Sequence, residues 1–311
     1  MAQELSSKLG AKEFQALFDR CSNWGHWGPD DERGTLNLIT PEQTRRAAGL
    51  VREGHTVSCA LPINTQADVE NTQPAVHLML RAGDVVESWP TRSTADYLAL
   101  APHGQAHSHL DALCHVSWQG KIYNDRPVSV VTSRGALANA ITIGQNGIVT
   151  RGVLLDIPPL KDVEWLEPGT AITPADLEAA ESAASLRVGE GDVLLVRTGR
   201  HRRRAATGPW DASATIAGLH YDCAPWLRER GVALLGCDGV SDFRPHPFEG
   251  VALPMHTLTL VAMGMQLLDN QNLDDLSEAC AARNRWEFML VIAPLRIERG
   301  TASATNPIAI F

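Results

Sequence analysis

Residues 103–115 read His103-Gly104-Gln105-Ala106-His107-Ser108-His109-Leu110-Asp111-Ala112-Leu113-Cys114-His115. Four of the eleven histidines of the chain fall in this stretch. His107, His109 and Asp111 occupy alternate positions, so an extended backbone would point their side chains to one face. Imidazole and carboxylate groups are ligands that zinc, manganese and iron accept in proteins. The stretch therefore predicts a divalent metal site.

The spacing also limits how such a site can be built. Neighbouring positions on one face of a strand lie about 6.5–7 Å apart, so two such side chains can converge on one ion. The span from His107 to Asp111 is about twice that distance, which is too wide for three ligands on a straight strand. We therefore expect that the chain bends here, or that one ligand comes from a distant segment.

The overall charge argues against one class of partner. The 311 residues include 27 basic and 36 acidic side chains, and the formal net charge of −9 disfavours nucleic-acid binding. One basic run, at residues 200–204, is interpreted as a solvated loop, with an anionic ligand or a subunit contact as alternatives. We expect small molecules, and neither nucleic acid nor membrane, as partners.

The cysteines and the terminus indicate the compartment. Six cysteines are scattered without a Cys-x-x-Cys pair, which is typical of a reducing environment. Cys114 is interpreted as a small buried residue, with a thiolate nucleophile as the alternative. The N-terminal residues lack a signal-peptide pattern, and the chain has no long apolar run free of polar residues. We expect a cytoplasmic protein.

Strand and helix signals alternate loosely along the chain. Strands are expected at 56–63, 75–80, 148–157, 193–197, 232–238 and 289–297, and those at 148–157, 193–197 and 232–238 are expected to be buried. Thr40-Pro41 and Thr173-Pro174 are helix-start signatures, and a further helix is expected at 221–230. Residues 82–98 and 301–307 are expected to be polar connections. No linker divides the chain, so we expect one α/β domain over residues 1–311, with residues 1–55 as a helical arm packed on it.

These residues resemble the metal-dependent cyclase family, which includes bacterial kynurenine formamidase and isatin hydrolase. The family carries a His-x-Gly-Thr-His-x-Asp-x-x-x-His stretch, whose second half matches residues 108–115 here. Gly34-Thr35-Leu36-Asn37 and Thr305-Asn306-Pro307 resemble its longer branch of about 300 residues. The resemblance implies a swivelling β/β/α fold with a central mixed sheet and flanking helices. It also implies hydrolysis of a small amide, lactam, lactone or ester, a zinc or manganese ion, and a homodimer or homotetramer.

The resemblance also implies roles for single residues. His109 and Asp111 match metal ligands, and His115 matches a histidine near the scissile bond. His256 matches a downstream histidine that binds a second metal or assists catalysis, and both roles stay open. Asp269 lies where the family has a glutamate, and its shorter side chain leads us to expect one strong metal at most.

The ligand stretch departs from the family at two positions. Gln105 stands where the family has a ligand histidine, and His107 replaces the family glycine. We expect His107 to be the third ligand, with His103 as a substitute. The missing Gly-Thr pair leaves open how the chain bends at this point.

A bound metal with an open coordination position lowers the pKa of a water molecule and polarises a carbonyl group, which is the chemistry that hydrolysis needs. A nearby histidine can then move the proton; His115 is the first candidate and His256 the second. Trp24, Trp27 and Trp89 are interpreted either as the lining of a pocket for a flat, cyclic or aromatic substrate or as ordinary core residues.

Two other functions remain open. The pattern His109-x-Asp111 with a distant His256 also matches the ligand triad of a non-haem iron oxygenase. A binding protein with a degenerate site is the third reading, because the ligand histidine at position 105 is missing.

Overall fold

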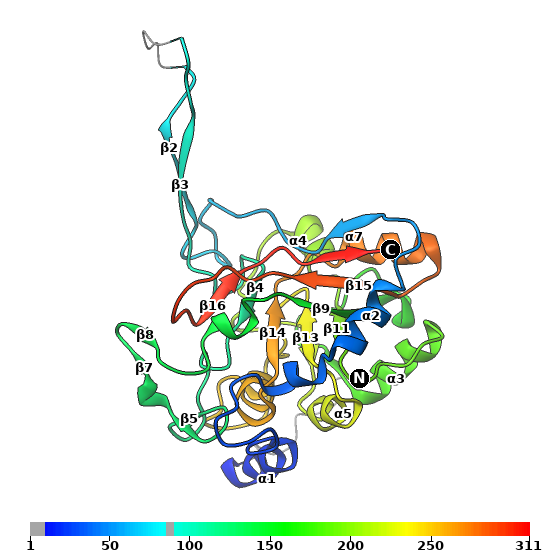
Figure 1. Ribbon diagram of the computed structural model, residues 1–311. Helices are drawn as coiled ribbons and strands as arrows, with labels where there is room; N and C mark the ends of the chain where they lie inside the picture. The colour runs from blue at the N-terminus through cyan, green and yellow to red at the C-terminus, as the bar shows by residue number, and fades with distance from the viewer. Residues whose placement is uncertain (1–9, 85–89) are drawn as a thin grey trace.

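The computed structural model describes residues 10–84 and 90–311 (Figure 1). Its largest element is a nine-stranded sheet with the strand order β1-β17-β15-β9-β11-β13-β14-β4-β16. β9, β11, β13 and β14 run parallel to one another, and the other pairings of this sheet are antiparallel. The α/β class with a central mixed sheet is thereby confirmed. In sheet order, the strands are Thr56–Ser58, Ile308–Ile310, Glu287–Ile292, Ile148–Asp156, Val193–Arg197, Leu234–Cys237, Gln266–Asp269, His109–Asp111 and Ala302–Ala304.

Apolar residues cover both faces of the central strands. In β11, Leu194 and Val196 belong to one buried cluster, while Val193 and Leu195 belong to a second. Successive side chains of a strand point to opposite faces, so each cluster fills the space between the sheet and the elements covering one face. The helices are α1 (Ala11–Cys21), α2 (Pro41–Ala48), α3 (Pro174–Ala183), α4 (Arg200–Thr207), α5 (Cys223–Arg230), α6 (Pro254–His256, continued by a π-helical segment Thr257–Met263) and α7 (Asp274–Arg283).

Two helices begin at the residues that the sequence indicates. The Thr40 hydroxyl accepts a hydrogen bond from the backbone N–H of Gln43 at the start of α2. At the start of α3, Thr173 and Asp176 cap each other's backbone N–H groups. These reciprocal bonds satisfy N–H groups that the first turn of a helix leaves without partners. Both helix-start predictions are confirmed.

Three segments differ from the expectation. Ala95–Ala99, expected within a polar connection, forms strand β3 and pairs with β2 (Val76–Arg81). Ala302–Ala304, expected as a turn, forms edge strand β16 next to β4. Residues 200–204, expected as a loop, lie in helix α4 (Arg200–Thr207). Pairing with a distant strand, or docking onto the body, decides such short elements, and local sequence carries little of that information.

Short elements complete the described chain. Two-stranded sheets are formed by β5 and β6 (Lys121–Ile122, Arg126–Pro127), β7 and β8 (Val131–Thr132, Gly135–Ala136), and β10 and β12 (Ala171–Ile172, Gly218–Leu219). Single 3₁₀ turns lie at Gly34–Leu38, Val128–Val130, Ile141–Gly144 and Pro158–Lys161. Across the described ranges, the helices are too short or too polar to cross a membrane.

Candidate metal centre

Two neighbouring strands bring three candidate ligands to one face of the sheet. β4 runs antiparallel to β14, and His109 lies directly opposite Asp269. Directly opposed residues of an antiparallel pair project to the same side, and Asp111 follows His109 by two positions on that side. The antiparallel addition of β4 to the parallel strands therefore creates the site. All three side chains are almost fully buried.

A first donor group consists of His103, His109 and Asp111. Nδ1 of His103 lies 2.9 Å from Oδ1 of Asp111, and Nε2 of His109 lies 3.4 Å from the same oxygen. One donor atom from each residue falls within 4.8 Å of the others. His103 precedes β4, and its other ring nitrogen contacts the Thr301 hydroxyl. The His103 side chain is 29% exposed, which makes it the most accessible member of the group.

A second donor group shares Asp111 with the first. Nε2 of His256 lies 3.6 Å from Oδ2 of Asp111 and 3.3 Å from Oδ2 of Asp269. These donor atoms also lie within 4.8 Å of one another. Asp111 thus presents one carboxylate oxygen to each group. Asp269 still reaches His256, although its side chain is one methylene shorter than the glutamate of the family pattern.

The far side of each ligand is held by a hydrogen bond. His109 Nδ1 lies 2.8 Å from the carbonyl oxygen of His107, and His256 Nδ1 lies 2.5 Å from Asp242. Each Nδ1 therefore donates its proton outward, which leaves Nε2 as the ring nitrogen that faces the site. The Ser241 hydroxyl donates to Oδ1 of Asp269. Such outer hydrogen bonds are typical of histidine and carboxylate metal ligands.

The state of Asp111 fits a bound cation. The residue is fully buried, yet neither carboxylate oxygen accepts a hydrogen bond of good geometry from residues 10–84 or 90–311. Burial by itself would raise the pKa of this carboxyl, but the charge of His109 and the contacts with His103 and His256 hold it well below its ordinary value. A buried carboxylate without hydrogen-bond donors is costly unless a cation compensates it. The residues present therefore fit a divalent metal ion.

His256 and His115 differ in protonation. Burial would lower the pKa of His256, but Asp111, Asp242 and Asp269 raise it well above its ordinary value. A metal ion at Nε2 therefore has to displace a proton. Burial lowers the pKa of His115 to about 4, so that its imidazole is neutral near pH 7. The His115 ring stacks on His103 at 3.7 Å between ring centres and lies 6.3 Å from the His256 ring.

The structure does not bring His107 and Gln105 to either group. Among the described residues, neither donor group includes His107. His107 instead lines a different cavity, of about 700 Å³. The extended segment begins only at His109, so the alternation expected from His107 onwards does not hold. His103, which sequence reasoning ranked second, takes the place beside Asp111. The Gln105 side chain lies at a third cavity, of about 410 Å³.

Other predicted residues lie apart from the centre. Trp24 packs edge-on against Phe18 and donates its indole N–H to the carbonyl of Val261, so it belongs to the core. The Trp27 ring contacts His26, and Trp89 lies outside the described residues. Burial raises the pKa of Cys114 to about 12, which does not favour the thiolate alternative.

Sequence reasoning missed the outer residues Ser241 and Asp242. They follow β13 in the loop that begins at Asp238, an acid at the carboxyl end of a strand, where α/β proteins often build sites. A Ser-Asp pair just after such a strand is the signal that could have indicated them. Asp242 also accepts the backbone N–H groups of Met255 and His256, which fixes the start of α6.

The chain is similar to known proteins over most of its length. The cyclase family model matches residues 36–242. The kynurenine formamidase of Bordetella petrii is 30% identical over 199 residues, which cover 61% of this chain and 85% of the relative.

Solved structures show the same fold. A crystal structure of a novel cyclase superimposes with a TM-score of 0.84 at 32% identity, and covers 93% of this chain and 99% of that one. Isatin hydrolase A from Labrenzia aggregata, bound to benzyl benzoate, gives a TM-score of 0.60 at 20% identity, covering 85% and 94%. The similarity to isatin hydrolase A concerns the fold alone. The family match, which spans about two thirds of the residues, and these similarities show together that the chain belongs to the cyclase family.

Proposed function

We propose that this protein is a metal-dependent hydrolase that cleaves a small-molecule amide, lactam, lactone or ester. The observation that carries the proposal is the buried Asp111 carboxylate. It lies between His103, His109 and His256, and the described part of the chain offers it no well-aligned hydrogen-bond donor. The similarity to a kynurenine formamidase supports a C–N bond, as in an aryl formamide or cyclic amide, as the first choice.

We assign the two donor groups to zinc or manganese. His103, His109 and Asp111 would hold one ion, and Asp111, His256 and Asp269 a second, with Asp111 shared between them. This proposal replaces His107 with His103 and extends the expectation of one strong metal to two adjacent sites. When bound, the metal supplies a Lewis acid for the substrate carbonyl and lowers the pKa of a water molecule.

The surrounding residues of this chain have separate tasks. Asp242 and the His107 carbonyl keep the Nε2 lone pairs of His256 and His109 directed into the site. His115 is neutral and lies against His103, the exposed edge of the centre, so an imidazole nitrogen of His115 can take up a proton and return it to the leaving group. We therefore assign proton transfer to His115 and metal binding to His256.

An assay with and without metal tests the proposed function. Aryl formamides, cyclic imides, lactams, lactones and esters are offered to the enzyme as purified, after chelation, and after reloading with zinc or manganese. We expect hydrolysis of at least one class, its loss after chelation, and its recovery on reloading. Hydrolysis that is equal in the chelated enzyme would refute the metal dependence. Oxygen consumption that requires iron would favour the oxygenase alternative, and a metal-free inert protein would favour the binding protein.

Substitution of Gln105 tests whether His103 or Gln105 is the metal ligand. Its side chain is not among the donors of either group, and a neutral amide binds zinc far more weakly than imidazole. Gln105→Ala should therefore keep the metal content of the wild type, whereas His103→Ala should lose the first ion. Elemental analysis of both variants checks this. A loss of metal in Gln105→Ala equal to that in His103→Ala would show that the assignment of His103 is wrong.

We also propose that the protein forms a homo-oligomer through the β2–β3 hairpin. The hairpin projects from the body of the molecule (Figure 1). Its register places Leu78 opposite Tyr97 and Val76 opposite Ala99, so these residues share one face. Leu78 and Tyr97 are about half exposed. An isolated two-stranded hairpin is only marginally stable in water, and a second copy could cover this apolar face.

Charge on that face should separate the copies. A lysine at Leu78 or Tyr97 would be buried without a partner in the interface, which is unfavourable. We expect sedimentation equilibrium to find a dimer or tetramer for the wild type and a monomer for the double variant Leu78→Lys, Tyr97→Lys. Val163→Lys, at an exposed apolar residue elsewhere, is the control. A monomeric wild type would contradict the proposal.

A further inference from the structure

Asn270 follows the donor Asp269 and ties it to the loop that precedes β4. Asn270 is fully buried and has a left-handed backbone, with φ of 55°. Its side-chain amide nitrogen, Nδ2, donates to the backbone carbonyls of Gly104, at 2.7 Å, and His107, at 3.2 Å. In return, the Ser108 hydroxyl donates to the Asn270 carbonyl at 2.5 Å. The segment from His103 to His109 is therefore held from outside by a residue of a distant strand end.

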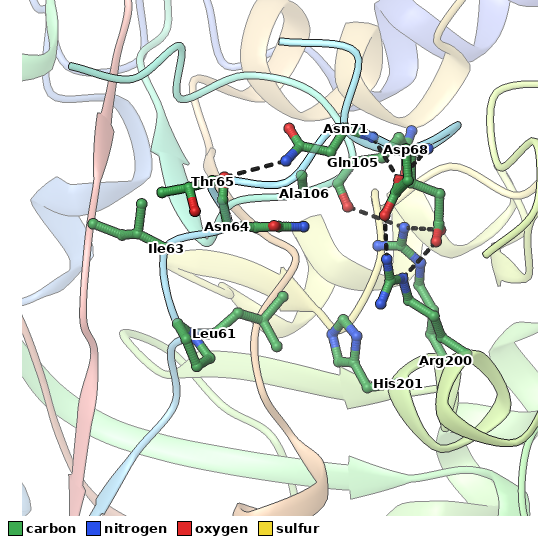
Figure 2. Close-up of a pocket in the computed structure, with 13 residues that line it drawn as sticks. Leu61, Ile63, Asn64, Thr65, Asp68, Asn71, Gln105, Ala106, Arg200 and His201 are labelled. Carbon is green, nitrogen blue, oxygen red and sulfur yellow. Dashed lines mark hydrogen bonds and ion pairs between the residues drawn. The ribbon is translucent and has the colours of Figure 1, made fainter. Parts of the chain in front are cut away.

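Arg200 holds Asn270 in this position. Its guanidinium donates to the Asn270 side-chain oxygen at 2.6 Å and to the Gln105 carbonyl at 3.0 Å. Figure 2 shows Arg200 extending from helix α4 toward Gln105. Arg200 therefore acts on the loop twice, once directly and once through Asn270.

Glu70 compensates the charge of Arg200. Its carboxylate accepts from the guanidinium at 2.6 Å, and the side chains of Arg200 and Glu70 are only 3% and 2% exposed. A buried ion pair of this kind is weak evidence for stability, because desolvation offsets much of the attraction. The backbone N–H of Arg200 is fixed as well, since it donates to the buried Asp238. Both the guanidinium and the backbone of Arg200 are therefore held in place, which indicates that this buried cation has a role other than solubility.

Hydrogen bonds connect Arg200 in an unbroken series to His109, one of the candidate metal ligands. The His107 carbonyl accepts from Asn270 and also from Nδ1 of His109, the bond that directs Nε2 of His109 into the site. Glu70, Arg200, Asn270, His107 and His109 are thus linked in series. Arg200 and Glu70 line the polar cavity of about 410 Å³ in Figure 2, which none of the metal donors lines. Arg200 therefore acts on the site through the loop.

We propose that Arg200 is a positioning residue for the metal centre. Through Asn270 and the Gln105 carbonyl, it holds the bend that places His103 and His109 beside Asp111. This inference rests on the proposed function, because it concerns the affinity of the first donor group for its ion.

Metal affinity, measured by competition of Zn²⁺ between the protein and a chromophoric chelator, tests this role. Loss of an outer hydrogen-bond partner typically weakens metal binding about 10–100-fold. Arg200→Met should show a loss of this size, and Arg200→Lys a smaller one, because lysine keeps the charge but cannot reach both acceptors. Asn270→Asp should resemble Arg200→Met, since it keeps the Arg200 contact but removes both donations to the loop.

Arg204→Met is the matched control. Arg204 lies one turn further along α4 and also pairs with Glu70, through the other carboxylate oxygen, and with Asp68. It has no hydrogen bond to the loop among the contacts of the described residues. We expect its zinc affinity to stay within about twofold of the wild type. Circular dichroism confirms folding of each variant, and if Arg200→Met does not fold, Arg200→Lys and Asn270→Asp decide.

The outcomes separate the two proposals. If the wild type binds neither zinc nor manganese, the proposed function fails. If the wild type binds zinc and the folded Arg200 and Asn270 variants bind it equally well, the positioning role is overturned while the proposed function stands. A loss of affinity in Arg204→Met equal to that in Arg200→Met would also overturn it, because the effect would then belong to Glu70 or to the helix.

Discussion

Asp111→Asn should lose both metal ions and lower hydrolysis about 10³-fold or more. Each carboxylate oxygen of Asp111 faces one donor group, so a single residue serves both. Asparagine keeps the volume but offers one neutral oxygen and a donor N–H₂ group, which opposes a cation. Several kcal/mol of barrier lowering by the metal would be lost, and each 1.36 kcal/mol is a factor of ten in rate.

Elemental analysis and the rate of amide hydrolysis measure the two effects together. Asp19→Asn, at an exposed acid on α1, is the control and should match the wild type in both. Asp111→Asn with full metal content would show that Asp111 is not a ligand. Asp111→Asn without metal but with unchanged hydrolysis would remove the metal from the mechanism.

His115→Ala should keep the metal and lose about 10²–10⁴-fold in kcat, which corresponds to roughly 3–5 kcal/mol. His115 stacks on His103 but lies outside both donor groups, and its lowered pKa leaves it neutral near pH 7. His115→Asn should be nearly as poor, because asparagine can form hydrogen bonds but cannot transfer a proton at this pH.

A control variant accompanies the His115 prediction, and two different outcomes would contradict it. His55→Ala changes an exposed histidine and should have wild-type kcat. Loss of metal in His115→Ala would make His115 a ligand. Full activity would make it a packing residue of His103 and would move proton transfer to His256.

Much of the fold could be predicted because its signals are local. The capping residues Thr40 and Thr173 bond to the helices that follow them. The apolar runs of β9, β11 and β13 need burial on both faces whatever their neighbours are. The edge strand Ala302–Ala304 gave no such signal, because its small residues become a strand only through pairing with β4. The one-domain organisation of residues 1–311 stays a prediction.

The sequence indicated most of the residues of the candidate site, but it indicated less well how they are arranged in space. The structure brings together His109, Asp111, His256 and Asp269, to which the family resemblance assigns roles, whereas His103 lies beside Asp111 where His107 was expected. The reason is the bend before β4, which Asn270 and Arg200 impose from segments about 95 to 166 residues away along the chain. Arg200 itself was interpreted as part of a solvated loop, because nothing in residues 200–204 indicates that Glu70 and Asp238 meet the first arginine in the interior.

The metal content of the freshly purified, unchelated wild-type protein tests the central claim most directly. Inductively coupled plasma mass spectrometry should find at least one equivalent of zinc or manganese per chain, and up to two if both donor groups retain their ions. A folded protein with no transition metal, and with no uptake when zinc or manganese is added, would contradict the account.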